Sequence, residues 1–227
     1  MHTKGILNAF QMKLLLVALM LLDHLYLYLP GMPDWFTWLG RLVAPVFTYL
    51  MVESYRHTSD KIRYIKRLTA AGLVMMAGNT LLTYIFGNTL SQNIFLSLAV
   101  SAGLLFYLDR FAQYMNRSHA FGIVCMFFLS FFCEGAIICP VMAVIFYYMR
   151  GNPPVMLLSF AGASVLLSLL LMPSFFPQVL MVGAALLLPL YNGRRGPGGA
   201  FAKWFFYVVY PVHIWILYAV NQLYFKA

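Results

Sequence analysis

Ionisable side chains stand inside two apolar runs near the amino terminus, within residues 13–58. Asp23 and His24 lie in the first run and Arg41 lies in the second, on either side of the short turn 30–34. Placing a charged side chain at the centre of a membrane helix costs about 2.5–3.5 kcal/mol on insertion scales, so such residues usually mark function. The sequence therefore points first to a site built around these three side chains.

Two of these side chains, His24 and Arg41, are matched in depth. His24 lies six positions before the turn, and Arg41 lies six positions after the first residue of the second run. At about 1.5 Å per helical residue, both lie roughly 9 Å below the same surface. His24 could act as a general base, and Arg41 could clamp an anion or form a structural ion pair. Because neighbouring side chains point about 100° apart on a helix, Asp23 could either neutralise Arg41 or orient the imidazole.

The composition indicates a membrane protein. Apolar residues make up 63% of the 227 residues and charged residues 9%, against about 45–50% and 25% in soluble proteins. At roughly 20 residues per crossing, the chain has room for about nine or ten spans. We therefore expect an all-α, polytopic integral membrane bundle forming a single domain over residues 1–227. The net charge of +9 is distributed between the apolar runs, which favours membrane topology and anionic lipid and argues against a nucleic-acid partner.

The basic cluster at residues 56–67 predicts the orientation, because cytoplasmic loops are enriched in Lys and Arg. This places the amino terminus in the cytoplasm and the carboxyl terminus outside. Residues 120–150 could form two short helices meeting at Glu134, which we prefer, or one long span that would reverse everything after it. The two-helix choice gives nine transmembrane helices, at about residues 13–29, 35–52, 68–86, 93–108, two within 120–150, 155–172, 177–191 and 204–224.

Other polar residues would lie at related depths in this topology. Counted from the cytoplasmic ends of their spans, His24, Asn79 and His213 all reach roughly 15–18 Å, near the middle of a core about 30 Å thick. We expect these residues to line a buried substrate site, together with Gln92, Asn93 and Glu134 nearer its outer end. Two structural alternatives stay open. His213 could satisfy a carbonyl that Pro211 leaves without its helical partner, and Glu134 could cap a tight hairpin.

Several short motifs resemble a known family. They are Leu21-Leu22-Asp23-His24, Gly40-Arg41 followed by Pro45 and Phe47, Arg56-His57, Gln92-Asn93-Ile94-Phe95, and the segment from Tyr207 to His213. In this order they resemble the TraX family, named for the conjugative-pilus protein that acetylates the amino terminus of F-type pilin. Cys133-Glu134-Gly135 departs from the Tyr-Gly expected at that place. The family is similar to a wider set of transmembrane acyltransferases that take acyl groups from cytoplasmic acyl-CoA.

The resemblance implies an acetyltransferase in the bacterial inner membrane, with acetyl-CoA as donor substrate, a pilin or other envelope molecule as acceptor, and no metal. His24 would be the catalytic base, or would carry the acetyl group covalently, with Asp23 and Arg41 beside it. Arg41 or Asn79 would stabilise the oxyanion. Basic residues on the cytoplasmic side would hold the phosphates of CoA: Arg56, His57, Lys61, Arg63, Arg194 and Arg195.

A non-catalytic membrane protein is the main alternative, either a transporter or a scaffold for pilus or envelope assembly. Polar residues at mid-membrane are equally typical of transporter sites, although no inverted repeat is visible in the sequence. Paired aspartates, a Ser/His pair and zinc-ligand spacing are also missing, so an intramembrane protease has no support.

Overall fold

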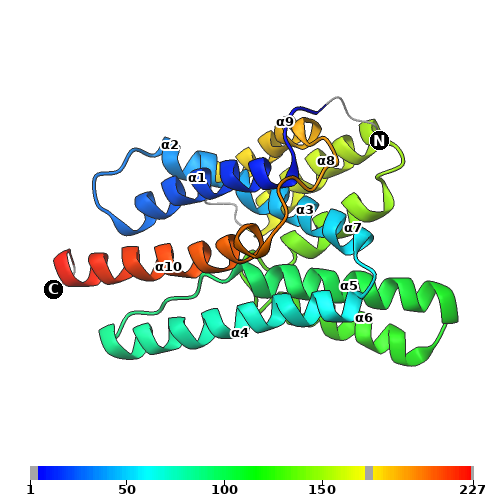
Figure 1. The fold of residues 1–227 in the computed structure, drawn as a ribbon, viewed down its shortest axis with the longest axis horizontal. Helices are drawn as coiled ribbons and strands as arrows, with labels where there is room; N and C mark the ends of the chain where they lie inside the picture. Colours follow the sequence, from blue (N-terminus) through cyan, green and yellow to red (C-terminus); the bar gives the residue numbers. More distant parts are fainter. Residues whose placement is uncertain (1–4, 172–175, 226–227) are drawn as a thin grey trace. The chain divides into compact units, whose positions relative to one another are not determined.

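The computed structural model describes residues 5–171 and 176–225, whose secondary structure consists of helices with no β-strand. A single β-bridge joins Leu7 to Tyr191. Figure 1 shows the elements. They are α1 (Ala9–Tyr28), α2 (Trp35–Gly40), α3 (Val43–His57), α4 (Lys61–Phe86), α5 (Ile94–Tyr114), α6 (Arg117–Ser130), α7 (Ile138–Tyr148), α8 (Pro153–Leu171), the 3₁₀ segment η1 (Phe176–Gly183), α9 (Ala184–Leu187), η2 (Leu188–Leu190) and α10 (Ala200–Tyr224).

Six helical segments within the described residues are long and apolar enough to cross a membrane. The all-helical fold is therefore confirmed, and the chain is a multi-pass membrane protein. The six are Ala9–Tyr28, Trp35–His57, Lys61–Phe86, Ile94–Tyr114, Pro153–Leu171 and Trp204–Tyr224.

The remaining three predicted spans are helical but short, so the count of nine crossings is not confirmed. Helix α6 has 14 residues and α7 has 11, which makes them about 21 and 16 Å long, against a core of about 30 Å. The segment 177–190 is mostly 3₁₀ helix, with one short α-helical stretch at α9. The prediction for 155–172 ends on a residue outside the described part. The cytoplasmic amino terminus stays a prediction.

Residues 120–150 form two helices, as preferred from the sequence. The turn between α6 and α7 contains Gly135 at φ 74° and Ala136 at φ 45°. This left-handed backbone cannot continue a right-handed helix, so a single long span is excluded.

The second predicted span is broken at Arg41 and Leu42, between α2 and α3. Pro45 explains the break, since proline has no N–H to donate to the carbonyl of residue 41 and its ring clashes with that carbonyl. The guanidinium predicted to lie in mid-span therefore projects from a helix end.

The described residues divide into two compact units. Unit 1 falls within residues 1–47, 78–90 and 164–227, and unit 2 within 48–77 and 91–163. Helices α3, α4 and α8 each contribute to both units. The single domain over 1–227 stays a prediction.

In unit 1, α1 packs against α2 and α10 (Figure 1). Its buried residues recur every fourth position: Met12, Leu16, Met20, His24 and Tyr28. Positions four apart lie on one helix face, so the imidazole belongs to the packed face of α1. Asn8 begins the helix through a capping box with Gln11, which satisfies donors that the first turn would otherwise leave unpaired.

In unit 2, α5 is the central element and contacts α6 and α7. Its residues Ile94–Leu105 are buried without interruption. An aromatic core lies beside it, where the Phe146 ring centroid is 5.4 Å from that of Tyr49 and 5.3 Å from that of Phe160. Small residues allow the close approach of α5 and α6, since a Cβ on Gly122 would lie 2.5 Å from Cε1 of Tyr107.

Candidate functional site

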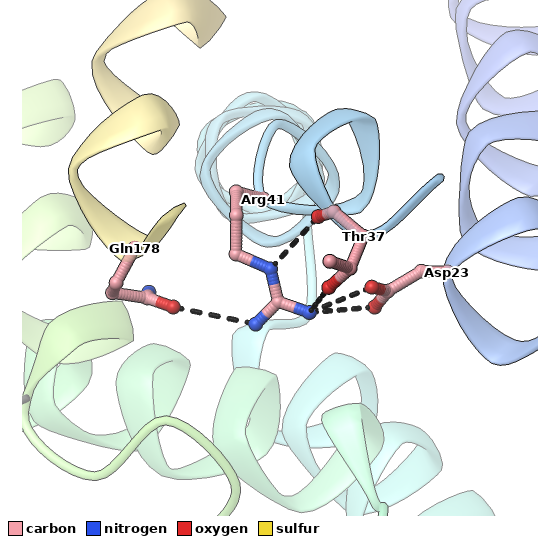
Figure 2. A network of polar contacts seen from close by, with 4 residues as sticks. All are labelled: Asp23, Thr37, Arg41 and Gln178. Carbon is pink, nitrogen blue, oxygen red and sulfur yellow. Dashed lines mark hydrogen bonds and ion pairs between the residues drawn. The ribbon is translucent and has the colours of Figure 1, made fainter. Parts of the chain in front are cut away.

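An ion pair between α1 and the end of α2 forms the first part of the site in unit 1 (Figure 2). Nη2 of Arg41 donates to both carboxylate oxygens of Asp23, at 2.7 and 2.9 Å. The same guanidinium donates to the carbonyl and the hydroxyl of Thr37, each at 3.1 Å, and to Oε1 of Gln178 at 3.3 Å. All three guanidinium nitrogens are thus engaged, so Arg41 is a positive group held in a fixed orientation.

Gly40 provides the space in which this ion pair forms. A Cβ at position 40 would lie 2.6 Å from Oδ1 of Asp23 and still closer to its Cγ and Cβ. Only glycine therefore allows the aspartate of α1 to lie against the backbone of α2 beside the arginine. The Gly-Arg pair seen in the sequence thus has a steric reason.

A pair of histidines forms the second part of the site, between α1 and α10. Nδ1 of His24 lies 2.7 Å from Nε2 of His213, and the stacked rings have centroids 4.9 Å apart. Only 5% of His24 is exposed. Between the two roles considered for Asp23, the structure therefore shows the ion pair with Arg41, while His213 is the hydrogen-bonding partner of His24.

His213 is also bonded within its own helix. Its Nδ1 lies 2.6 Å from the carbonyl oxygen of Val209. The carbonyl that Pro211 cannot pair with is that of Tyr207, four residues before the proline. The contact with Val209 is therefore different from the kink-satisfying role considered from the sequence.

Asn79 belongs to the same unit, at the point where α4 passes α10. Its Oδ1 accepts a hydrogen bond of 2.9 Å from Nε1 of Trp215, and Asn79 is 4% exposed. A Cβ on Gly78 would collide with the Trp215 ring, so glycine permits the approach of these two helices. The three residues predicted to lie at mid-membrane therefore all belong to unit 1, where α1, α4 and α10 contribute His24, Asn79 and His213.

The other predicted substrate-binding residues lie in unit 2 and hold the start of α5. Oε2 of Glu134 accepts from the backbone N–H of Asn93 at 2.6 Å. The Asn93 side chain caps α5 and donates to the carbonyl of Gly72 at 2.8 Å. A carboxylate at a helix amino terminus is favourable because of the helix dipole. These contacts fit the capping alternative for Glu134, and Gln92 beside them is half-buried.

The predicted CoA-binding residues have varied surroundings. In unit 2, the Arg56 guanidinium lies 5.5 Å from the ring centroid of Tyr147, and Nζ of Lys61 lies 4.1 Å from that of Tyr55. Arg63 is 85% exposed and pairs with Asp60. His57 bonds the carbonyl of Glu53 within α3, and Arg194 and Arg195 are exposed residues of unit 1.

Sequence reasoning missed several polar partners. Thr37 stands four residues before Arg41 on the same helix side, a spacing that could have revealed it, whereas no local signal points to Gln178. In unit 2, Glu53 is 3% exposed and accepts from Nη2 of Arg150 at 2.6 Å. Asp109 there accepts hydrogen bonds from the hydroxyls of both Tyr55 and Tyr147.

Comparison with known proteins places the chain in a family. The profile of the TraX protein family matches residues 9–221. A probable fimbrial assembly protein FimC (serogroup H1) of Dichelobacter nodosus is 26% identical over 235 residues, covering 92% of this chain and 94% of the relative. No solved structure matches the chain. The resemblance read from the short motifs is confirmed, and the chain belongs to the TraX family.

Proposed function

We propose that this protein is a membrane acetyltransferase that moves an acetyl group from acetyl-CoA to an amine or hydroxyl acceptor. The observation that carries the proposal is His24, an imidazole buried in a membrane-length helix and hydrogen-bonded through Nδ1 to a second histidine. With Nδ1 engaged, Nε2 is the nitrogen available to exchange a proton with the acceptor.

The reaction balances with one base. Nε2 of His24 takes a proton from the acceptor nitrogen or oxygen as that atom attacks the thioester carbonyl carbon. The carbon–sulfur bond then breaks, and the departing CoA thiolate takes the proton back from Nε2. The products are the acetylated acceptor and the free thiol of CoA, and the imidazole returns to its starting state.

Arg41 and Asn79 are the groups we assign to the negative charge that develops on the thioester oxygen. Arg41 contributes mainly as an oriented positive charge, since Asp23, Thr37 and Gln178 already fix its nitrogens. Donors oriented before the reaction stabilise a transition state without reorganisation at the moment of reaction. Trp215 fixes the orientation of the Asn79 amide in a comparable way.

The donor is inferred from the basic residues of the chain, and the acceptor from the name of a similar protein. The phosphates of acetyl-CoA would contact basic residues at the cytoplasmic ends of the helices. In unit 1, which contains His24, the exposed residues Arg194 and Arg195 are accessible for this contact. The Dichelobacter nodosus relative is named for fimbrial assembly, so we infer an acceptor among pilus or fimbrial subunits in the bacterial inner membrane. The terminal amine of such a subunit is a suitable nucleophile.

The test uses the purified protein in detergent with acetyl-CoA labelled in the acetyl group and a peptide amine as acceptor. Wild type should release CoA and label the peptide, whereas His24→Ala should lose at least about 100-fold in rate, the lower range for general-base catalysis. The matched control is His119→Ala in unit 2, which removes a histidine outside the site. Full transfer by a folded His24→Ala protein would refute the assignment, and label retained on wild-type protein would indicate a covalent acetyl-histidine.

An assembly scaffold is the second candidate, favoured by the fimbrial assembly name of the relative and by the ion pair that occupies both Asp23 and Arg41. A scaffold has no reason to break a thioester. Wild type that releases no CoA with any offered acceptor, yet binds a pilus subunit, would favour this candidate over the enzyme.

A further inference from the structure

Three groups in unit 1 form a chain of hydrogen bonds from α10 to α1. The Val209 carbonyl oxygen lies 2.6 Å from Nδ1 of His213, and Nε2 of His213 lies 2.7 Å from Nδ1 of His24. A carbonyl oxygen can only accept a hydrogen bond, so Nδ1 of His213 must carry a hydrogen.

The positions of the other hydrogens follow when both rings are neutral. A neutral imidazole carries one N–H, so Nε2 of His213 has a lone pair and accepts. The hydrogen of the 2.7 Å contact therefore belongs to Nδ1 of His24. His24 in turn has its own lone pair on Nε2. A backbone carbonyl on α10 thus determines, through one intervening ring, which nitrogen of a histidine on α1 is basic.

We propose that His213 is a positioning residue that holds His24 in the tautomer with its lone pair on Nε2. This inference rests on the proposed function, because it names what makes His24 able to act as the base. In the opposite tautomer Nε2 would carry a hydrogen and could not take a proton from the acceptor. The loss of the correct histidine tautomer in a hydrolase triad lowers the rate by about 10⁴-fold, which sets the scale for this effect.

The pair also accommodates the charge that forms during transfer. When Nε2 of His24 takes the acceptor's proton, the ring becomes an imidazolium while its Nδ1–H stays bonded to the neutral Nε2 of His213. A hydrogen bond from a charged donor is roughly twice as strong as one between neutral groups. When Nε2 gives its proton to the CoA sulfur, both rings return to their starting tautomers, and His213 never changes its protonation state.

Asp23 cannot perform this role in the structure, although it is adjacent to His24 in sequence. Its carboxylate is bound to Arg41, on a different side of α1. The residue that orients the imidazole therefore comes from α10, 189 positions away.

Nitrogen-15 NMR of histidine-labelled protein tests the tautomer without any substrate. The two ring nitrogens of a neutral imidazole give well-separated shifts according to which one bears hydrogen, and the signals of His24 are identified by their loss in His24→Gln. Wild type should show hydrogen on Nδ1 of His24. His57 provides an internal reference, since its Nδ1 lies 2.8 Å from the carbonyl oxygen of Glu53 one turn back, as His213 does with Val209.

Two substitutions of His213 separate positioning from packing. His213→Gln keeps an acceptor and should retain the Nδ1–H tautomer of His24 and acetyl transfer within about tenfold of wild type. His213→Leu removes the acceptor; it should lose the tautomer preference and about 10²-fold or more in rate. Two results would overturn the inference: hydrogen on Nε2 of His24 in wild type, or equal rates for the Leu and Gln variants.

The NMR experiment tests the role of His213 and the transfer assay tests the proposed function, so either proposal can be refuted without the other experiment. An active wild type with the wrong tautomer overturns the role of His213 and leaves the acetyltransferase proposal standing. An inactive wild type with the expected tautomer overturns the proposed function, and with it the catalytic meaning of the histidine pair.

Discussion

Replacing Gly40 with alanine is the most direct perturbation of the site that avoids its polar residues. The added Cβ would lie 2.6 Å from Oδ1 of Asp23, and closer still to Cγ and Cβ of the same residue. The Cβ atom of Asp23 is fixed to the backbone of α1, so a change of the Asp23 rotamer cannot remove its overlap with the added Cβ. Either α1 and α2 must separate, or Asp23 must leave Arg41.

The expected cost follows from the two alternatives. Forcing an extra methyl group into a packed contact costs about 1–3 kcal/mol. Breaking a fully buried ion pair costs about 3–5 kcal/mol, and exposed pairs contribute only about 0–1 kcal/mol. Arg41 and Asp23 side chains are 24% and 19% exposed, which places this pair between those limits. We therefore expect Gly40→Ala to lower the free energy of unfolding by about 2 kcal/mol.

The measurement is reversible unfolding in mixed micelles, followed by circular dichroism. Gly162→Ala is the matched control, because this position also lies within a helix but a Cβ there meets nothing within 4 Å. It should leave stability unchanged or raise it by up to about 1 kcal/mol, the helix propensity difference between glycine and alanine. Equal stability of the two variants would refute the steric explanation of the Gly-Arg motif.

Two further predictions concern unit 2. Glu53→Leu should destabilise the protein by about 3 kcal/mol, because it leaves the half-buried guanidinium of Arg150 without its partner. The double variant Glu53→Leu/Arg150→Leu should recover most of that loss, since Oε1 of Glu53 and Nε of Arg150 are buried without hydrogen bonds in wild type. A double variant less stable than Glu53→Leu would contradict this reasoning. Asn93→Ala should cost about 1–2 kcal/mol through loss of the α5 cap. Asn93→Asp should keep the cap bond to Leu96, but it loses the donor to Gly72 and adds a second carboxylate beside Glu134, so it should not restore wild-type stability. Both variants are measured by the same unfolding assay.

Much of the fold could be predicted from the lengths of the apolar runs and from the polar segments that separate them. Every predicted span is helical over most of its described residues, and residues 120–150 form two helices that meet at the turn containing Glu134 and Gly135, as preferred from the sequence. The other three predicted crossings are not confirmed, because helices of 11–14 residues are shorter than the roughly 20 residues that usually cross the core.

The sequence could not predict which face of each helix is buried, and so it could not predict the contacts between the site residues. In α1 the buried stripe includes Leu16 and Met20, yet Leu14, Leu21 and Leu27 on other faces are exposed. Where lipid is the solvent, both faces of a helix are apolar and amphipathic periodicity disappears. The depth of a residue in the membrane can be counted from the end of its span, and this count predicts similar depths for His24 and His213. It does not predict that the two side chains are in direct contact.

The division of Asp23 and His24 between two partners has an electrostatic reason. Charges are least costly in a low-dielectric medium when they are paired with opposite charges, and neutral polar groups when they are hydrogen-bonded to one another. In unit 1 the carboxylate is paired with the guanidinium of Arg41, and the imidazole with another imidazole. A His24–Asp23 contact would instead have left the half-buried guanidinium of Arg41 without a counter-charge. Successive side chains on a helix point about 100° apart. Asp23 can therefore pair with Arg41 at the end of α2, while His24 contacts His213 of α10.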